Sequence, residues 1–364
     1  MKRIAILAGC ILLLAIAGIF LTSGQGMERE TDNHKPVKVG IVMIGSRSEN
    51  TWNEAHWAGL EKTGQKLKLS LVCEENVSTA SCAAVLERMI QDGCRVIVST
   101  SIDFEPAVQK VAQRNPAVYF FQATGIQGHA NVAAYTGRMY QMRYLAGIVA
   151  GSQTETQAVG YVTTQPIPEV IRGIDAFALG VRKANPQARI YVKYTQDWSD
   201  DSKARQVTRE LLDAQPDIDV LSMHLDTYGP LEVADERGVY TIGCNVDSRQ
   251  KYPDTCLTSA IWNWEIFYTK YIREALNGKF DGRNYIVGAD TGIVGLAPLA
   301  SLRKPEAAQL IADMQEKLIS GEYDVFYGPI RGTSGNLIVE AGEGVPDQIL
   351  FEELNWYVEG VVLP

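Results

Sequence analysis

Short apolar runs alternate with longer amphipathic segments from Pro36 onward. In the first part of the chain the short runs occupy residues 37–45, 69–75, 95–100 and 117–125. The longer segments, in which apolar residues recur every three or four positions, occupy residues 53–67, 79–93 and 105–115. Buried strands produce the first pattern, and helices that pack along one face produce the second. The alternation therefore predicts a parallel sheet with crossover helices.

The alternation pauses at residues 131–153, where apolar and small residues predict one long, tightly packed helix. It then resumes with strands predicted at 158–166, 189–195, 219–225 and 239–245, and helices predicted at 167–185, at 202–214 and in a short segment up to Arg237. Two successive units with no glycine-rich linker predict an α/β protein of two lobes joined by strand-like crossings. We assign residues 37–157 and about 262–292 to the first lobe, and residues 158–261 and about 293–364 to the second.

Ligands of open α/β sheets bind outside the carboxyl ends of the strands. In this chain the segments at those ends are residues 45–52, 101–104, 122–125, 164–169, 196–200, 224–228 and 245–247. They are rich in aromatic, carboxylate and amide side chains for loops. The sequence therefore predicts a ligand site at these strand ends.

The N-terminal segment has the layout of an export signal. Lys2 and Arg3 precede an unbroken apolar run, residues 4–21, and a polar segment follows the run. Residues 1–26 are thus predicted to be an export signal or a membrane anchor, and the protein is expected in the periplasm or on the cell surface, tethered to the membrane. The stretch "LAGC" resembles the lipobox of bacterial lipoproteins, which makes Cys10 a candidate lipidation site beside the alternatives of simple cleavage or anchoring near Ser23.

Composition and charge exclude some classes of function. The 364 residues carry a formal charge of −9 with no basic stripe, which argues against nucleic-acid binding. The four histidines are scattered without a metal-ligand spacing, so neither a metal nor another cofactor is expected. The cysteine spacings permit the pairs Cys73–Cys82 and Cys244–Cys256 with Cys94 left over, or five buried free thiols.

Several motifs together resemble one family. "SENTWNEAHWAGL" is similar to the aspartate-x-Ser-Phe-Asn-x-x-x-Tyr-x-Gly signature of the basic membrane protein family, the purine-nucleoside-type substrate-binding proteins of ABC importers. Glu49, Trp52 and Trp57 stand in place of the usual Asp, Phe and Tyr. "NVAAYTGRMYQMRYLAGIVAG", "GYVTTQPIPEVIRGIDAFALGVRKANP", "IGCNVDSR" and "TSAIWNWEIFY" also resemble the family, and the likeness extends over residues 37–364.

The resemblance implies a type I periplasmic-binding-protein fold, in which two Rossmann-like lobes close about a hinge on a ligand held in the cleft between them. In the family an aromatic ring from each lobe sandwiches a planar base, while carboxylates and amides bind its edge. By matching position, the implied ligand-binding residues are Trp52, Asn53, Gln122, Tyr140, Trp198, Asp226, Asp247 and Trp264. Trp52 and Trp198 would stack on the base, and one indole of the Trp262/Trp264 pair would line the cleft while the other packs its helix. Asn245 departs from the family, which often has an acid there, and Gln122 replaces another polar residue.

The predicted function is capture of a purine base or nucleoside, with an adenine-like ligand favoured, by a protein that is expected to act as a monomer. A permease would receive the ligand, and a separate ATPase subunit would supply energy because the chain has no GxxxxGK phosphate loop. An enzyme such as a nucleoside hydrolase is disfavoured because GxSxG, GxGxxG and a Ser, His and Asp constellation are all missing. A sugar or autoinducer binder of the same fold and a membrane-anchored ligand sensor remain alternatives.

Overall fold

Six parallel strands form the first sheet of the computed structural model, which describes residues 35–364. Their order across the sheet is β11-β5-β4-β3-β1-β2. The strands are β1 (Lys38–Val42), β2 (Ser70–Glu74), β3 (Cys94–Ser99), β4 (Tyr119–Ala123), β5 (Val132–Gly137) and β11 (Asn284–Val287). The predicted export signal, residues 1–26, and Cys10 lie outside the described residues. Within residues 35–364 no helix is long and apolar enough to cross a membrane.

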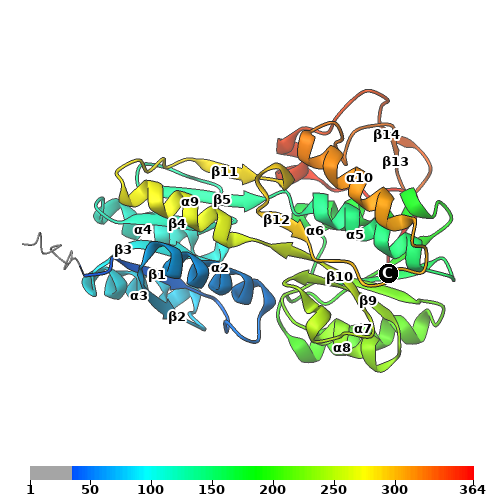
Figure 1. Ribbon diagram of the computed structural model, residues 1–364, viewed down its shortest axis with the longest axis horizontal. Helices are drawn as coiled ribbons and strands as arrows, with labels where there is room; N and C mark the ends of the chain where they lie inside the picture. The colour runs from blue at the N-terminus through cyan, green and yellow to red at the C-terminus, as the bar shows by residue number, and fades with distance from the viewer. Residues whose placement is uncertain (1–34) are drawn as a thin grey trace, which may run out of the picture. The chain divides into compact units, whose positions relative to one another are not determined.

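Helices cover both faces of this sheet. The helical elements of the first lobe are α2 (Thr51–Leu67), α3 (Thr79–Gln91), η1 (Ile102–Phe104), α4 (Glu105–Arg114) and α9 (Trp264–Leu276). One core contains Leu60 of α2 and Phe267 of α9, and another contains Leu86 of α3 and Val108 of α4. Helix α9, drawn in yellow, lies beside α2 in Figure 1. Because both faces are covered, the strands read as continuous apolar runs rather than as alternating ones.

The second sheet has seven strands in the order β12-β10-β9-β8-β6-β7-β15, and only β12 pairs antiparallel among the described residues. Its strands are β6 (Ala158–Thr163), β7 (Arg189–Tyr194), β8 (Val220–His224), β9 (Tyr240–Asn245), β10 (Cys256–Trp262), β12 (Val294–Leu296) and β15 (Val361–Val362). The helical elements of this lobe are α5 (Tyr140–Gln153), α6 (Pro168–Ala184), α7 (Asp201–Ala214), α8 (Gly229–Glu236), η2 (Ser248–Gln250), η3 (Ala289–Thr291) and α10 (Ala307–Ser320). The two-lobed α/β fold expected from the sequence is confirmed.

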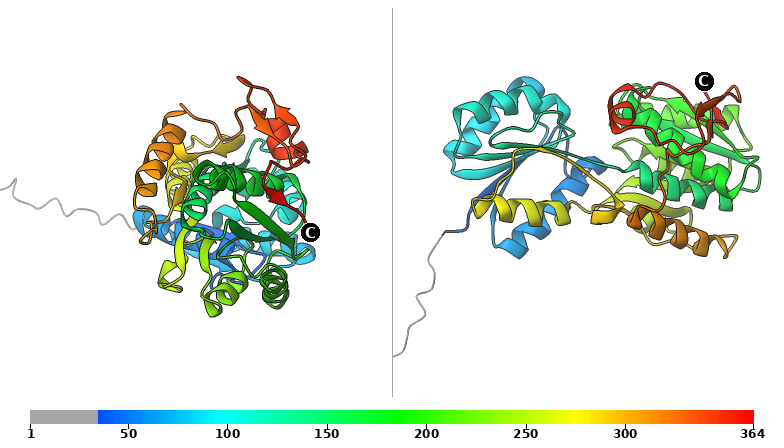
Figure 2. Two further views of the ribbon diagram at one scale, coloured as in Figure 1. Left: turned by 90° about the vertical axis from the view of Figure 1, so that its right-hand side faces the viewer. Right: turned by 90° about the horizontal axis from the view of Figure 1, so that it is seen from above.

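The C-terminal segment packs onto this second lobe. It contains a small antiparallel pair, β13 (Ile330–Arg331) and β14 (Leu337–Val339), and a π-helical turn, η4 (Ile349–Glu353). The segment, drawn in red, lies against the green helices of the lobe in Figure 2. The buried Asp175 carboxylate on α6 accepts a hydrogen bond from the Val358 backbone N–H at 3.0 Å. Leu354, Val358 and Val361 of this segment belong to the second lobe's core.

The prediction of one long helix at residues 131–153 is wrong in its first part. Residues 132–137 form β5, which lies between β4 and β11, and the helix α5 begins at Tyr140. A strand buried on both faces shows no alternation, so its small apolar residues read equally well as a helix. Tight packing is correct for α5, because a Cβ at Gly147 would lie 2.1 Å from the Phe177 carbonyl oxygen of α6.

Helix α5 also changes the composition of the lobes. We expected residues up to 157 to belong to the first lobe, but Leu145 and Val149 pack in the core that contains Val159 and Phe177 of the second lobe. The chain crosses between the sheets at residues 138–139, again between β10 and α9, and again between β11 and β12. The five cysteines from Cys73 onward are free thiols, which is the second of the two arrangements that their spacing permits.

Candidate functional site

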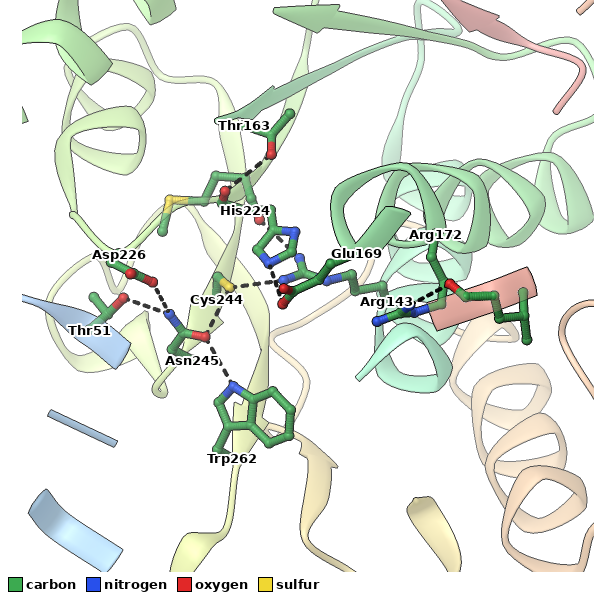
Figure 3. A network of polar contacts seen from close by, with 12 residues as sticks. Thr51, Arg143, Thr163, Glu169, Arg172, His224, Asp226, Cys244, Asn245 and Trp262 are labelled. Atoms are coloured by element: carbon green, nitrogen blue, oxygen red, sulfur yellow. Dashed lines mark hydrogen bonds and ion pairs between the residues drawn. The ribbon is translucent and has the colours of Figure 1, made fainter. Parts of the chain in front are cut away.

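Asn245, the last residue of β9, is the centre of a polar network at the carboxyl ends of the strands (Figure 3). Its amide Nδ2 donates to the Thr51 hydroxyl at 3.0 Å and to the Asp226 carboxylate at 3.1 Å. Its Oδ1 accepts from the Trp262 indole N–H at 3.1 Å and from the Cys244 thiol at 3.4 Å. We call Thr51, Asp226, Asn245 and Trp262 the Asn245 network. Thr51 begins α2 of the first lobe, so the network joins side chains of both lobes.

Asp226 holds this region together through its backbone as well. Its N–H donates to the Trp198 carbonyl oxygen, and its own carbonyl oxygen accepts from the Thr51 N–H, both at 2.8 Å. Burial raises the pKa of the Asp226 carboxyl to about 7, although the hydrogen bond from Asn245 acts in the opposite direction. Near neutral pH this group can therefore both donate and accept a hydrogen bond.

Two half-buried tryptophans are connected to Asp226 through the backbone: the Trp198 carbonyl oxygen accepts its N–H, and Trp52 follows Thr51. Trp52 follows Thr51, donates its Nε1–H to the Thr100 carbonyl oxygen at 2.7 Å, and meets the His56 ring edge-on at 4.4 Å between centroids. Trp198 meets the His224 ring edge-on at 5.2 Å. Trp52 also makes T-shaped contacts with Trp262 and Trp264, at 5.6 and 5.9 Å between centroids. The backbone contacts of Asp226 thus involve Trp198 itself and the residue that precedes Trp52, one from each lobe.

Asn53 follows Trp52 in α2, Gln122 lies near the end of β4, and both side chains are fully buried. The Asn53 Oδ1 accepts from the Thr100 hydroxyl at 2.9 Å, and the Gln122 Nε2 donates to the Ser101 carbonyl oxygen at 2.7 Å. The other polar atom of each amide, Asn53 Nδ2 and Gln122 Oε1, has no hydrogen-bond partner among the described residues. Such atoms are costly unless something pairs them, so they mark groups suited to bind a ligand.

We expected Trp264 to line the cleft, but in the structure Trp264 is buried and Trp262 is the half-buried member of the pair. Trp264 is 1% exposed and lies between two rings, stacked on His56 at 4.7 Å and on Trp262 at 4.5 Å. Trp262 is half-buried and hydrogen bonds to Asn245. Since α9 begins at Trp264, this indole points into the helix's packed face, whereas Trp262 is the last residue of β10.

Tyr140 and Asp247 have partners within the protein. Tyr140 is buried, its hydroxyl accepts from Arg138 at 3.1 Å, and its ring contacts Phe326 edge-on. Asp247 is exposed, and both of its carboxylate oxygens accept from Arg249, at 3.0 and 2.6 Å. The structure does not bring these two residues into the Asn245 network.

Two buried side chains near the network, Arg143 and His224, were not among the predicted site residues. Arg143 on α5 donates to the Tyr161 hydroxyl and the Met223 carbonyl oxygen, both at 3.2 Å. An arginine within an otherwise apolar helix is the signal that could have identified it. Burial, with Arg143 and Arg172 nearby, holds the pKa of His224 well below its ordinary value. His224 is therefore neutral at physiological pH.

Within residues 35–364, neither a metal centre nor the surface hollow on α2 and α9 involves the Asn245 network. No group of three or more His, Cys, Asp or Glu side chains within residues 35–364 is placed to hold a metal ion. A surface hollow of about 310 Å³ is lined by charged residues of α2 and α9, including Lys66, Glu265 and Arg273, and by none of the network. The strand ends thus remain the candidate ligand site.

Known proteins resemble this chain along most of its length. Residues 36–325 match the family of PnrA-like ABC transporter substrate-binding proteins. A purine-binding protein of Brucella abortus is 30% identical over 96% of this chain and 98% of its own. A candidate ABC-transporter glucose-binding protein of Haloferax volcanii is 31% identical over 89% of this chain and 80% of its own. Basic membrane protein A2 of Borrelia garinii is 25% identical over 80% of this chain and 88% of its own.

Solved structures of solute-binding proteins have the same fold. An ABC transporter solute-binding protein of Conexibacter woesei covers 79% of this chain and 98% of its own, with a TM-score of 0.66 and 24% identity. One from Aeropyrum pernix covers 79% and 93%, with a TM-score of 0.67 and 19% identity. A transcriptional activator of the comK gene from Bacillus halodurans covers 79% and 99%, with a TM-score of 0.70 and 24% identity. The fold is thus that of the type I periplasmic binding proteins.

The match over residues 36–325 covers more than half of the chain, and the sequence relatives extend along both lobes. Substrate-binding proteins of ABC importers are not enzymes; they bind a small molecule outside the cytoplasm and pass it to the permease subunits. This chain belongs to the basic membrane protein family, the PnrA-like substrate-binding proteins of ABC transporters.

Proposed function

We propose that this protein captures a purine base or nucleoside and delivers it to an ABC permease. The observation that carries the proposal is the 30% identity to the purine-binding protein of Brucella abortus, which extends over 96% of this chain. An adenine-like ligand is favoured because the run from Pro166 to Gly173 and the Trp262–Trp264 stretch resemble the branch of the family associated with such ligands.

The side chains at the strand ends support a flat heterocyclic ligand. Trp52 and Trp198 are half-buried rings that come from different lobes. Stacking of a base on an aromatic side chain contributes about 1 to 3 kcal/mol in nucleic-acid complexes, and the same interaction is open to a free purine. Two rings would therefore hold the two faces of the ligand.

Polar atoms near these rings suit the edge of a purine. Asn53 Nδ2 is an unpaired donor, Gln122 Oε1 is an unpaired acceptor, and Asp226 can act as either. A few placed polar groups of this kind give a largely apolar pocket its specificity. A ligand held by groups of both lobes would favour the closed form through a hinge motion.

Calorimetric titration of the full chain in mild detergent tests the proposal. The protein is first unfolded and refolded to remove carried-over ligand, and is then titrated with purine bases, purine nucleosides and glucose. The expected result is a dissociation constant of about 1 μM or tighter for one purine compound and no heat from glucose. Binding of glucose with silence from every purine would contradict the proposal.

Sugar capture is the second candidate because the Haloferax volcanii relative is a candidate glucose-binding protein at 31% identity. Sugar sites also use aromatic faces together with carboxylates and amides. Glucose in the same titration separates the two candidates directly. Silence from all compounds would favour a ligand sensor over a transporter of purines or sugars.

A further inference from the structure

The first turn of α2 contacts the second lobe through a side-chain pair as well as through Thr51. The Tyr228 hydroxyl donates to Glu54 Oε2 at 2.8 Å, and both side chains are half-buried. Tyr228 lies two residues after Asp226, whose carbonyl oxygen accepts from the Thr51 N–H. Glu54 and Thr51 are three residues apart, so they lie on the same face of α2. Two neighbouring hydrogen bonds thus connect the same two segments of different lobes.

Tyr228 is suited to hold this contact. Burial, and then the Glu54 carboxylate, raise the pKa of its hydroxyl above the ordinary value, so the hydroxyl keeps its proton and donates. A hydrogen bond to a carboxylate is roughly twice as strong as one between neutral groups. Within its own lobe, the Lys251 Nζ lies 3.8 Å from the centroid of the Tyr228 ring and 3.3 Å from the Glu232 carboxylate on α8. A cation–π contact therefore helps to fix the ring that reaches across to α2.

The Thr51 amide depends on the second lobe for its hydrogen bond. Thr51 is the first residue of α2, and the first four N–H groups of a helix have no acceptor within it. Its N–H instead donates to the Asp226 carbonyl oxygen at 2.8 Å, and the residue is fully buried. If the lobes separate at this place, the Thr51 amide loses its acceptor and becomes open to exchange with solvent.

We propose that Glu54 and Tyr228 form a latch that holds the two lobes together next to the ligand site. They are positioning residues, because they join the lobes and belong neither to the Asn245 network nor to the side chains that we expect to bind the ligand. A ligand that contacts both lobes binds the joined arrangement, so its apparent affinity rises with the fraction of molecules in that arrangement. The latch raises this fraction for any ligand, purine or sugar.

Hydrogen exchange of the Thr51 amide in the refolded, ligand-free full chain tests the latch, with fragmentation mass spectrometry to resolve single residues. Tyr228→Phe removes the hydroxyl but keeps the ring and its contact with Lys251. The Thr51 amide is expected to exchange roughly three- to tenfold faster than in the wild type, as expected for the loss of one hydrogen bond. The amide of Val98, in the core of β3, should exchange at the wild-type rate.

Two results with Tyr228→Phe would overturn the latch. An unchanged exchange rate of the Thr51 amide in the folded variant would show that the hydroxyl does not hold the lobes together. Equal acceleration at Thr51 and Val98 would show a loss of overall stability in place of a local separation of the lobes. Both readouts are made without ligand, so failure of purine binding in the calorimetric titration leaves this test intact.

Glu54 variants and a matched tyrosine assign the effect to the contact. Glu54→Ala removes the acceptor and should accelerate Thr51 exchange as Tyr228→Phe does, whereas Glu54→Gln keeps a side-chain oxygen that accepts and should restore part of the protection. The double variant Tyr228→Phe with Glu54→Ala should exchange little faster than either single variant, because both changes remove the same hydrogen bond. Tyr240→Phe, which alters an exposed tyrosine at the start of β9, should leave the rate unchanged. Additive acceleration in the double variant would overturn the pairing of Glu54 with Tyr228.

Discussion

Asn53 and Asn245 are both buried asparagines, one in the first turn of α2 and one at the end of β9, yet they are paired very differently. Asn53 lies in the first turn of α2 and leaves its Nδ2 without a partner among the described residues. Asn245 ends β9 and pairs every donor and acceptor of its amide with the protein. The first arrangement costs stability, since a buried unpaired polar atom costs about 1 to 3 kcal/mol, whereas the second joins parts of both lobes.

We therefore expect the two asparagines to have different roles, one in binding the ligand and one in stabilising the fold. Asn53, Gln122 and Trp52 all hydrogen bond to the Thr100–Ser101 segment, and two of them keep a free polar atom. These are the side chains that we expect to bind the ligand. The Asn245 network instead holds the strand ends in place. The predictions below therefore contrast affinity with stability.

Trp264→Ala is expected to have the largest effect, because this indole lies between His56 of the first lobe and Trp262 of the network. Removing a fully buried tryptophan typically costs about 3 to 5 kcal/mol of unfolding free energy. Trp262→Ala should cost less than Trp264→Ala, since Trp262 is half-buried. Urea unfolding of both variants measures the difference, and a larger loss for Trp262→Ala would contradict the assignment of Trp264 to the core.

Asn245→Leu should destabilise the protein more than Asn53→Leu. The first change leaves Thr51, Asp226 and the Trp262 indole N–H without their partner, and the expected cost is roughly 3 kcal/mol. The second change removes the unpaired Nδ2 and one paired atom, the Oδ1, whose donor Thr100 still has the Val42 carbonyl oxygen as an acceptor, so it should cost about 1 kcal/mol. Chemical denaturation without ligand gives both values. A larger loss of unfolding free energy in Asn53→Leu than in Asn245→Leu would contradict the difference between the two asparagines.

Trp52→Ala is expected to weaken binding of the preferred purine by about 10- to 100-fold, the effect of losing one stacking ring. Trp57→Ala is the matched control, because Trp57 lies on the same helix, is also half-buried, and carries Arg47 over its ring at 4.9 Å. Its affinity should stay near the wild-type value. Wild-type affinity in a folded Trp52→Ala protein would remove the stacking role.

The last prediction concerns pH rather than a lost contact, and it is the pH dependence that Asp226 contributes to stability. Burial raises the pKa of this carboxyl to about 7 in the folded protein, above its ordinary value near 4 in the unfolded chain. The folded state thus binds more protons between these values, so the contribution of Asp226 is complete below about pH 4 and is lost as the pH rises through about 7.

Asp226→Asn keeps the acceptor for Asn245 but cannot ionise. The unfolding free energy of the wild type relative to this variant should therefore fall as the pH is raised from about 5 to 8. Denaturation of the two proteins in parallel at several pH values measures this difference. A constant difference across that range would show that the Asp226 carboxyl does not titrate as the structure indicates.

Much of the fold could be predicted because parallel strands buried on both faces leave unbroken apolar runs such as residues 39–42 and 158–162. The strand β5 was missed because Ala133 and Ala134 suit a helix well and a strand buried on both faces shows no alternation. The lobe to which α5 belongs depends on its contact with α6, and no local pattern encodes such a partner.

The candidate site could be predicted in position but not in detail. The rule that ligands bind at strand ends led to the segments that contain Trp52 and Asp226, and the family resemblance implied Asn53. The structure joins these segments, because the Thr51 N–H donates to the Asp226 carbonyl oxygen. Which of Trp262 and Trp264 is buried depends on where β10 ends and α9 begins, within two residues. The saturation of Asn245 could not be predicted, because its partners come from distant parts of the chain.

A crystal structure of the full chain with the tightest-binding purine tests the central claim most directly. The account predicts that the purine ring lies on Trp52, that Asn53 Nδ2 donates a hydrogen bond to its edge, and that all four hydrogen bonds of Asn245 remain in place. A ligand that binds the Asn245 amide in place of Thr51 or Trp262, or that touches neither Trp52 nor Asn53, would contradict it.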